Sequence, residues 1–110
     1  MRKLRVLVAD DEEAVRLALV RLTEALGHTV AAEARDGQEA VVQARTADPD
    51  VALLDIRMPR MDGLEAARAI SECRPLPIII VTAHADAELM ERAAAVGAFS
   101  YLLKPITRER

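Results

Sequence analysis

Three aspartates stand at the ends of two apolar runs in the sequence. Asp10 and Asp11 follow residues 4–9, and Asp55 follows residues 51–54. If both runs are strands of one parallel sheet, the three carboxylates meet at one edge of it. Carboxylates packed together repel one another, which raises at least one pKa unless a cation compensates. Mg²⁺ prefers oxygen ligands such as carboxylates, waters and phosphates, so the cluster predicts a magnesium site.

A hydroxyl group and an ammonium group end two further apolar runs. Thr82 follows residues 78–81, and Lys104 follows residues 101–103. With a metal ion they could surround a phosphoryl group, because phosphoryl transfer depends on positioning and on neutralising charge on the equatorial oxygens. Asp55 would then be the nucleophile.

Each of these residues also has a plainer explanation. An aspartate after a strand is commonly a turn or cap residue, and Asp11 could simply cap the helix that follows. Lys104 could be a solvated charge, and Thr82 a β-branched strand residue. These explanations weaken jointly, because four strand ends supply the ligands, nucleophile, hydroxyl and cation that one reaction needs.

Short apolar runs alternate with helical stretches along the whole chain. We predict strands at residues 4–9, 29–34, 51–54, 78–81 and 101–103, and helices at residues 13–26, 38–47, 64–73 and 87–96. Short, almost continuously apolar runs are typical of buried parallel strands, which need crossover connections. We therefore expect an α/β doubly wound sheet of five parallel strands in the order 2-1-3-4-5. In that order the acids lie between strands one and three, where strand order reverses.

Two helix starts carry the spacing of a capping box, in which an acid at the cap and a glutamate three residues later each accept from backbone N–H groups. Asp36 with Glu39 is the first pair, and Asp62 with Glu65 is the second. Both helices are therefore expected to begin at these aspartates.

The composition argues against a nucleic-acid-binding, membrane-bound or disulfide-stabilised protein. The net charge is −3 with acids and bases interspersed, which gives no electrostatic footprint for nucleic acid or an anionic membrane. The lone cysteine, Cys73, excludes an internal disulfide and fits a reducing compartment. No apolar stretch reaches the roughly 18 residues of a membrane span. We expect one cytoplasmic domain that binds neither nucleic acid nor membrane.

Taken together, the motifs resemble the receiver domain of bacterial two-component response regulators, across essentially the whole chain. The match rests on Asp10-Asp11, on residues 55–63 (Asp-Ile-Arg-Met-Pro-Arg-Met-Asp-Gly), on Thr82-Ala83 and on Lys104-Pro105. The resemblance implies a flavodoxin-like receiver domain over residues 1–110 that takes a phosphoryl group from a sensor histidine kinase. It implies self-phosphorylation and autodephosphorylation, not an enzyme with a separate substrate.

The resemblance also assigns roles around the metal ion. Asp55 is the phosphoacceptor, and Asp11 and Asp55 bind Mg²⁺ directly. Asp10 acts through water, and Arg57 contributes its backbone carbonyl. Arg57 and His84, two residues after the phosphoacceptor and two after the threonine, influence how long the phosphate survives.

Further roles concern the phosphoryl group and the switch. Lys104 pairs with the acyl phosphate and is catalytic together with Asp55. Thr82 donates its hydroxyl to the phosphate, and Ala83 offers a backbone N–H. Tyr101 turns inward when the phosphate captures the threonine hydroxyl, and so carries the signal outward.

The resemblance extends to output. The fourth helix, fifth strand and fifth helix form the usual output face, through which two copies could pair as a homodimer. Residues 107–110 supply only a first turn of the fifth helix, so we expect that helix and any effector domain to be missing. Residues 84–105 look similar to receivers linked to ANTAR RNA-binding antiterminator domains, which favours regulation of transcription or antitermination. DNA-binding effectors and a stand-alone receiver stay open.

Two other functions compete with this one. The first is an unphosphorylated receiver-like interaction module. The second is a Mg²⁺-dependent phosphatase with an aspartyl nucleophile, which uses the same transition-state chemistry. Such enzymes typically need a second acid two residues after the nucleophile, and Arg57 stands there instead.

Overall fold

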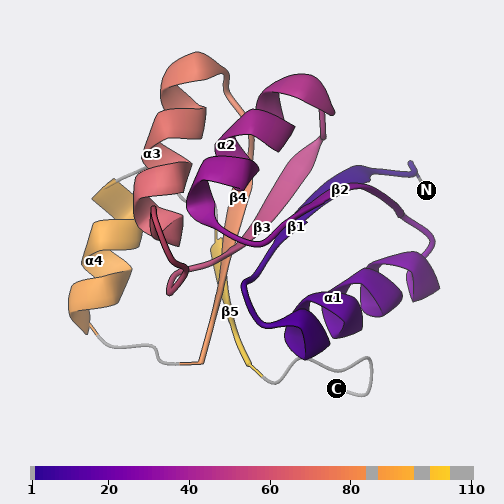
Figure 1. Cartoon of the computed structure of the whole chain (residues 1–110), viewed down its shortest axis with the longest axis horizontal. Helices are drawn as coiled ribbons and strands as arrows, with labels where there is room; N and C mark the ends of the chain where they lie inside the picture. The colour runs from indigo at the N-terminus through magenta and orange to yellow at the C-terminus, as the bar shows by residue number, and fades with distance from the viewer. Residues whose placement is uncertain (1, 84–86, 96–99, 105–110) are drawn as a thin grey trace.

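The computed structural model describes residues 2–83, 87–95 and 100–104 (Figure 1), and, within the last two segments, no side chains of residues 89 and 100–103. The strands of this part of the chain are β1 (Arg5–Ala9), β2 (Thr29–Ala34), β3 (Val51–Asp55), β4 (Ile78–Thr82) and β5 (Ser100–Leu103). Its helices are α1 (Glu13–Ala25), α2 (Gly37–Thr46), α3 (Gly63–Cys73) and α4 (Ala87–Ala95). The predicted alternation of strands and helices is confirmed.

All five strands run parallel in one sheet, in the order β2-β1-β3-β4-β5. This is the predicted order. Asp55 and Thr82 are the last residues of β3 and β4, not the residues after them, because the ladder continues to Asp55 opposite Val81 and to Thr82 opposite Leu103. Both polar side chains are therefore held at the sheet's carboxyl edge by strand pairing.

The helices cover both faces of the sheet, with α1 on one face and α2, α3 and α4 on the other (Figure 1). In β1, Leu7 and Ala9 pack toward the second group of helices, and Val6 and Val8 toward the α1 side. Because neighbouring side chains of a strand point to opposite faces, a strand buried on both faces is apolar throughout. This accounts for the uninterrupted apolar run that predicted β1.

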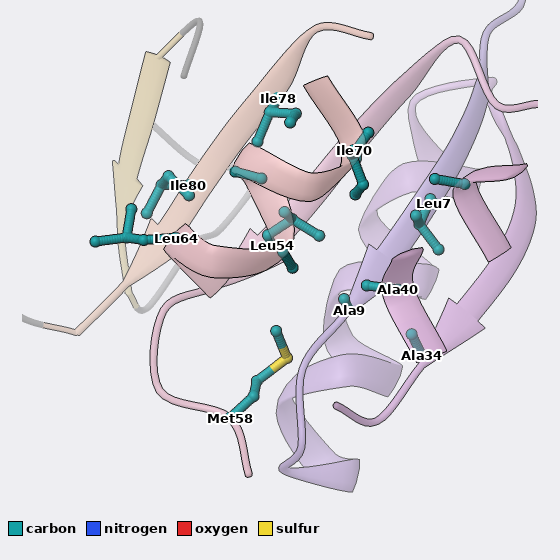
Figure 2. Close-up of a cluster of buried hydrophobic side chains, with 14 of the residues drawn as sticks. Leu7, Ala9, Ala34, Ala40, Leu54, Met58, Leu64, Ile70, Ile78 and Ile80 are labelled. Atoms are coloured by element: carbon teal, nitrogen blue, oxygen red, sulfur yellow. The ribbon is translucent and has the colours of Figure 1, made fainter. Parts of the chain in front are cut away.

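The larger core is aliphatic and rich in alanine (Figure 2). Ala40 of α2 is fully buried against the sheet, and Leu64 and Ile70 of α3 pack over the β3 and β4 side chains. Small residues let the helix backbone approach the strands closely. The strand ends that carry the polar residues therefore rest on a densely packed base.

The two predicted capping boxes differ in the structure. Asp62 and Glu65 form the complete box, with a bond in each direction. Asp36 accepts from the Glu39 backbone N at 2.8 Å, but the Glu39 carboxylate accepts from the backbone N of Arg35, so the return bond was predicted wrongly. Arg35 also pairs with Glu39 through its guanidinium, which draws that carboxylate past Asp36.

The expected truncation of the fifth helix concerns residues 105–110, which lie outside the described part of the chain. Among the helices that are described, none is long and apolar enough to cross a membrane.

Candidate functional site

The three aspartates singled out in the sequence come together in space. One carboxylate oxygen from each of Asp10, Asp11 and Asp55 lies within 4.8 Å of the others. Asp10 and Asp55 are buried, whereas Asp11 is exposed at the mouth of the cluster. The site therefore has a buried acidic floor that opens to solvent on one side.

Both oxygens of Asp10 already have partners within the protein. Its Oδ1 accepts a hydrogen bond from the Glu12 backbone N at 2.9 Å, and its Oδ2 accepts from Lys104 Nζ at 2.8 Å. The N-cap residue of α1 is Glu12, and no side chain caps this helix start. Asp11 is thus not the helix cap of the plainer explanation, and with Asp55 it is better placed than Asp10 to bind a metal ion directly.

Lys104 joins the two buried acids. Besides its contact with Asp10, its Nζ lies 3.3 Å from Asp55 Oδ1, and its side chain is only 14% exposed. Its backbone N donates to the Thr82 carbonyl, which fixes the start of the side chain at the end of β5. Burial alone would lower the pKa of Lys104, but the hydrogen bond to Asp10 and the charge of Asp55 raise it above the usual value. Lys104 is therefore a fixed cation and not a solvated charge.

The negative charge around Asp55 is larger than the single positive charge of Lys104 can balance. Burial and, after it, the charge of Asp10 raise the pKa of Asp55, and Lys104 offsets only part of the rise, so that the pKa is about 6. An acid in this state favours a proton or a further cation. The ligand atoms are all carboxylate oxygens, which suits Mg²⁺ and not a softer metal ion.

Replacing Asp55 by asparagine is expected to stabilise the metal-free protein at neutral pH. The pKa is raised from 3.8 to about 6 on folding, so the wild-type acid contributes stability below pH 4 that is lost as the pH rises through 6. At about 1.4 kcal/mol per pKa unit, and allowing for solvent screening, the variant's advantage should grow from near zero at pH 4 to roughly 1–3 kcal/mol at pH 7.5. Urea denaturation with a chelator measures it, and an advantage independent of pH would contradict the raised pKa.

Two contacts that support the site were not predicted from the sequence, although Gly63 is part of the motif at residues 55–63. Arg16 of α1 is buried, and its Nη1 donates to the Asp10 carbonyl at 2.9 Å while its Nε contacts Glu33. Gly63 begins α3 so close to β3 that an added Cβ would lie 1.9 Å from the Asp55 carbonyl oxygen. Two features of the sequence could have indicated them. Arg16 stands between Val15 and Leu19, on the apolar side of α1, and Gly63 directly follows the cap residue of α3.

The remaining predicted site residues are only partly described. Thr82 is buried at the end of β4, and Ala83 follows it at the surface. Arg57 is exposed two residues after Asp55. The backbone of Tyr101 pairs with Ile80 in β5, but its side chain lies outside the described part, as does all of His84.

The chain matches the family model described as response regulator receiver domain over residues 6–110. The transcriptional regulatory protein PdtaR of Mycobacterium tuberculosis is 43% identical over 103 residues, which cover 94% of this chain and 50% of PdtaR. The chain thus spans about half the length of this relative.

Solved structures agree with the fold. The signal receiver domain of a NarL response regulator from Mycobacterium tuberculosis superposes with a TM-score of 0.90 at 39% identity, covering 98% of this chain and 89% of that one. CheY in the CheX-CheY-BeF₃-Mg complex from Borrelia burgdorferi gives a TM-score of 0.90 at 29% identity, covering 94% of this chain and 80% of that one.

Proposed function

The chain belongs to the response regulator receiver domain family, and from this premise we propose that it is a signalling module switched by phosphorylation of Asp55. The observation that carries the proposal is the position of Asp55. Its buried carboxylate contacts the ammonium of Lys104 and lies beside two further acids at the sheet's carboxyl edge. This arrangement provides a nucleophile, a fixed cation and a place for a divalent ion at one point.

Mg²⁺ fits the site through its oxygen ligands. Asp11, Asp55 and the backbone carbonyl of Arg57 would hold it directly, and Asp10 through water. When bound, the ion supplies positive charge against the phosphoryl oxygens. CheY of Borrelia burgdorferi forms a complex that contains BeF₃ and Mg, and BeF₃ has the charge and shape of a phosphoryl group, which supports the same chemistry here.

The transfer step uses this chain's own groups. A carboxylate oxygen of Asp55 attacks the phosphorus of a phosphohistidine on a sensor kinase, whose ring is protonated on the nitrogen that carries no phosphorus. As the O–P bond forms, the P–N bond breaks, its electron pair returns to the ring nitrogen, and neutral imidazole leaves with the proton it already carried. Lys104 balances charge on the phosphoryl oxygens, and the Thr82 hydroxyl and the Ala83 N–H donate to them. The product is an aspartyl phosphate that the same site later hydrolyses, with Arg57 and His84 setting its lifetime.

The output is proposed from the same family. Capture of the Thr82 hydroxyl by the phosphate turns Tyr101 inward and alters the face formed by α4, β5 and a fifth helix, where a second copy pairs. Similarity to PdtaR, a transcriptional regulatory protein of about twice the matched length, supports an effector domain outside this chain that acts in transcription or antitermination. A cytoplasmic location fits the composition and the kinase partner.

Removal of Mg²⁺ is expected to abolish phosphoryl uptake. The wild-type protein, incubated with acetyl phosphate and Mg²⁺, should give a slower band on a phosphate-retention gel, and a chelator should remove that band because the acidic site then lacks its balancing charge. If no slower band forms with Mg²⁺, the unphosphorylated interaction module is the better description. Turnover of p-nitrophenyl phosphate would instead favour the phosphatase, although Arg57 replaces the second acid which that reaction needs.

A further inference from the structure

The loop between β3 and α3, residues 56–62, is anchored at its base beside the phosphoacceptor. The Gly63 backbone N donates to the Ile56 carbonyl at 2.8 Å, which closes the loop where it leaves Asp55. The side chains of Ile56 and Met58 are buried on either side of exposed Arg57 (Figure 2 shows Met58). The first half of the loop, residues 56–60, carries Arg57 and therefore starts from a fixed position.

The tip of the same loop is held by an ion pair with the start of α2. Arg60 Nη1 lies 2.7 Å from Asp36 Oδ2, and the Asp36 side chain is 7% exposed while that of Arg60 is 63% exposed. The other oxygen of Asp36 caps α2. The Glu39 N–H bond lowers the pKa of Asp36, burial opposes this, and the charge of Arg60 lowers it further. The carboxylate is thus ionised at neutral pH.

A second contact seats the tip against α2. A Cβ added to Gly37, the first residue of the helix, would lie 1.9 Å from the Met61 carbonyl oxygen, so the backbones of helix and loop touch there. The tip also borders an open groove, which Pro59 and Arg60 line together with Asp11 and residues of α2. Both Arg60 and Met61 of the tip thus contact the start of α2.

Arg60, which makes this pair, has an unfavourable backbone conformation. Its φ is +68°, in the left-handed region that glycine or asparagine enters more readily than arginine. Such a conformation persists only where the surrounding structure holds the residue in place. Here the bond to the nearly buried carboxylate of Asp36 holds it.

We propose that Asp36 and Arg60 are positioning residues for the metal site. The bond at the base of the loop holds one end of residues 56–60, and the Asp36–Arg60 pair holds the other. The backbone carbonyl of Arg57 thereby keeps the direction needed to bind Mg²⁺. The inference rests on the proposed function, because it needs the ion to bind at the aspartate cluster.

Three variants separate positioning from general stability. Asp36→Asn keeps the helix cap, since asparagine caps as well as aspartate, but removes the charged pair. Arg60→Gly removes the pair and also relieves the left-handed backbone, so it should unfold no more easily than the wild type. Arg60→Lys keeps a charge within reach of Asp36. Arg68→Gln, in the exposed Arg68–Glu72 pair of α3, is the matched control.

The readout is the Mg²⁺ dissociation constant from titration calorimetry, with urea denaturation alongside. Asp36→Asn and Arg60→Gly are each expected to weaken Mg²⁺ binding by about three- to tenfold, less than the roughly ten- to hundredfold effect of groups that bond directly to a metal ligand, because the pair acts on the Arg57 carbonyl through the loop. The double variant should be no weaker than either alone, because one pair is lost in all three. Arg60→Lys should recover most of the affinity, and Arg68→Gln should keep all of it.

The outcomes also distinguish the inference from the proposed function. If the wild type binds Mg²⁺ and both single variants bind it equally well, the positioning role is wrong while the proposed function stands. A fall in affinity that follows a fall in urea stability in Arg60→Gly would likewise reduce the pair to a structural contact. Failure of the wild type to bind Mg²⁺ would overturn the proposed function and the inference together.

Discussion

The Asp55→Asn variant is expected to take up no phosphoryl group from acetyl phosphate and Mg²⁺. Asparagine is close to aspartate in shape but offers no carboxylate nucleophile. The neighbouring acids cannot substitute, because both oxygens of Asp10 are engaged by Glu12 and Lys104, and Asp11 lacks a contact from the lysine among the described bonds. Intact-mass spectrometry after incubation measures the uptake directly.

Asp48→Asn is the matched control for this change. Asp48 precedes β3, at the opposite end of the strand from Asp55, its side chain is exposed, and its left-handed φ of 52° suits asparagine. We expect wild-type uptake in this variant. Phosphorylation of Asp55→Asn at the wild-type rate would show that the phosphoryl group is transferred to another residue. Unfolding cannot explain a loss of uptake, because Asp55→Asn is expected to be more stable than the wild type in the absence of metal.

Lys104→Ala is expected to slow phosphorylation by about 100–1000-fold, the usual effect of removing one preorganised donor to a developing negative charge. The ammonium is held 2.8 Å from Asp10 and 3.3 Å from Asp55, so it needs little reorganisation to reach a phosphoryl oxygen. Its removal also leaves two buried carboxylates without their cation, so the metal-free protein should unfold more easily. Single-turnover rates at saturating Mg²⁺ and phosphodonor test the first effect.

Lys3→Ala controls for the loss of a lysine, because Lys3 is exposed and precedes β1 at the far end of the sheet. It should phosphorylate at the wild-type rate. A Lys104→Ala rate within about threefold of the wild type would mean that the ammonium does not act on the phosphoryl group, since a preorganised donor contributes far more than that.

The fold and the main site were predictable because both follow from strand periodicity. Uninterrupted apolar runs indicate strands buried on both faces, and parallel pairing brings their carboxyl ends to one edge. Asp10, Asp55, Thr82 and Lys104 could therefore be brought together without knowledge of any side-chain contact. Lys104 and Asp10 meet although they are 94 residues apart.

The contacts that hold the site could not be predicted in the same way. Arg16 bonds to the Asp10 carbonyl and Arg60 to Asp36, and both depend on where helices and loops rest against strands. Sequence spacing carries no information about such partners. The Glu39 side chain shows the same limit at short range, because a competing guanidinium at Arg35 redirected a bond whose spacing favoured Asp36.

Chemical mapping of the phosphorylated residue tests the central claim most directly. Borohydride reduces an aspartyl phosphate to homoserine, so peptide mass spectrometry after reduction identifies the residue that carried the phosphate. We predict homoserine at position 55 alone, and only in protein incubated with both Mg²⁺ and phosphodonor. Homoserine at position 10 or 11, or none at all in protein that gives the slower gel band, would contradict the assignment of Asp55 as phosphoacceptor.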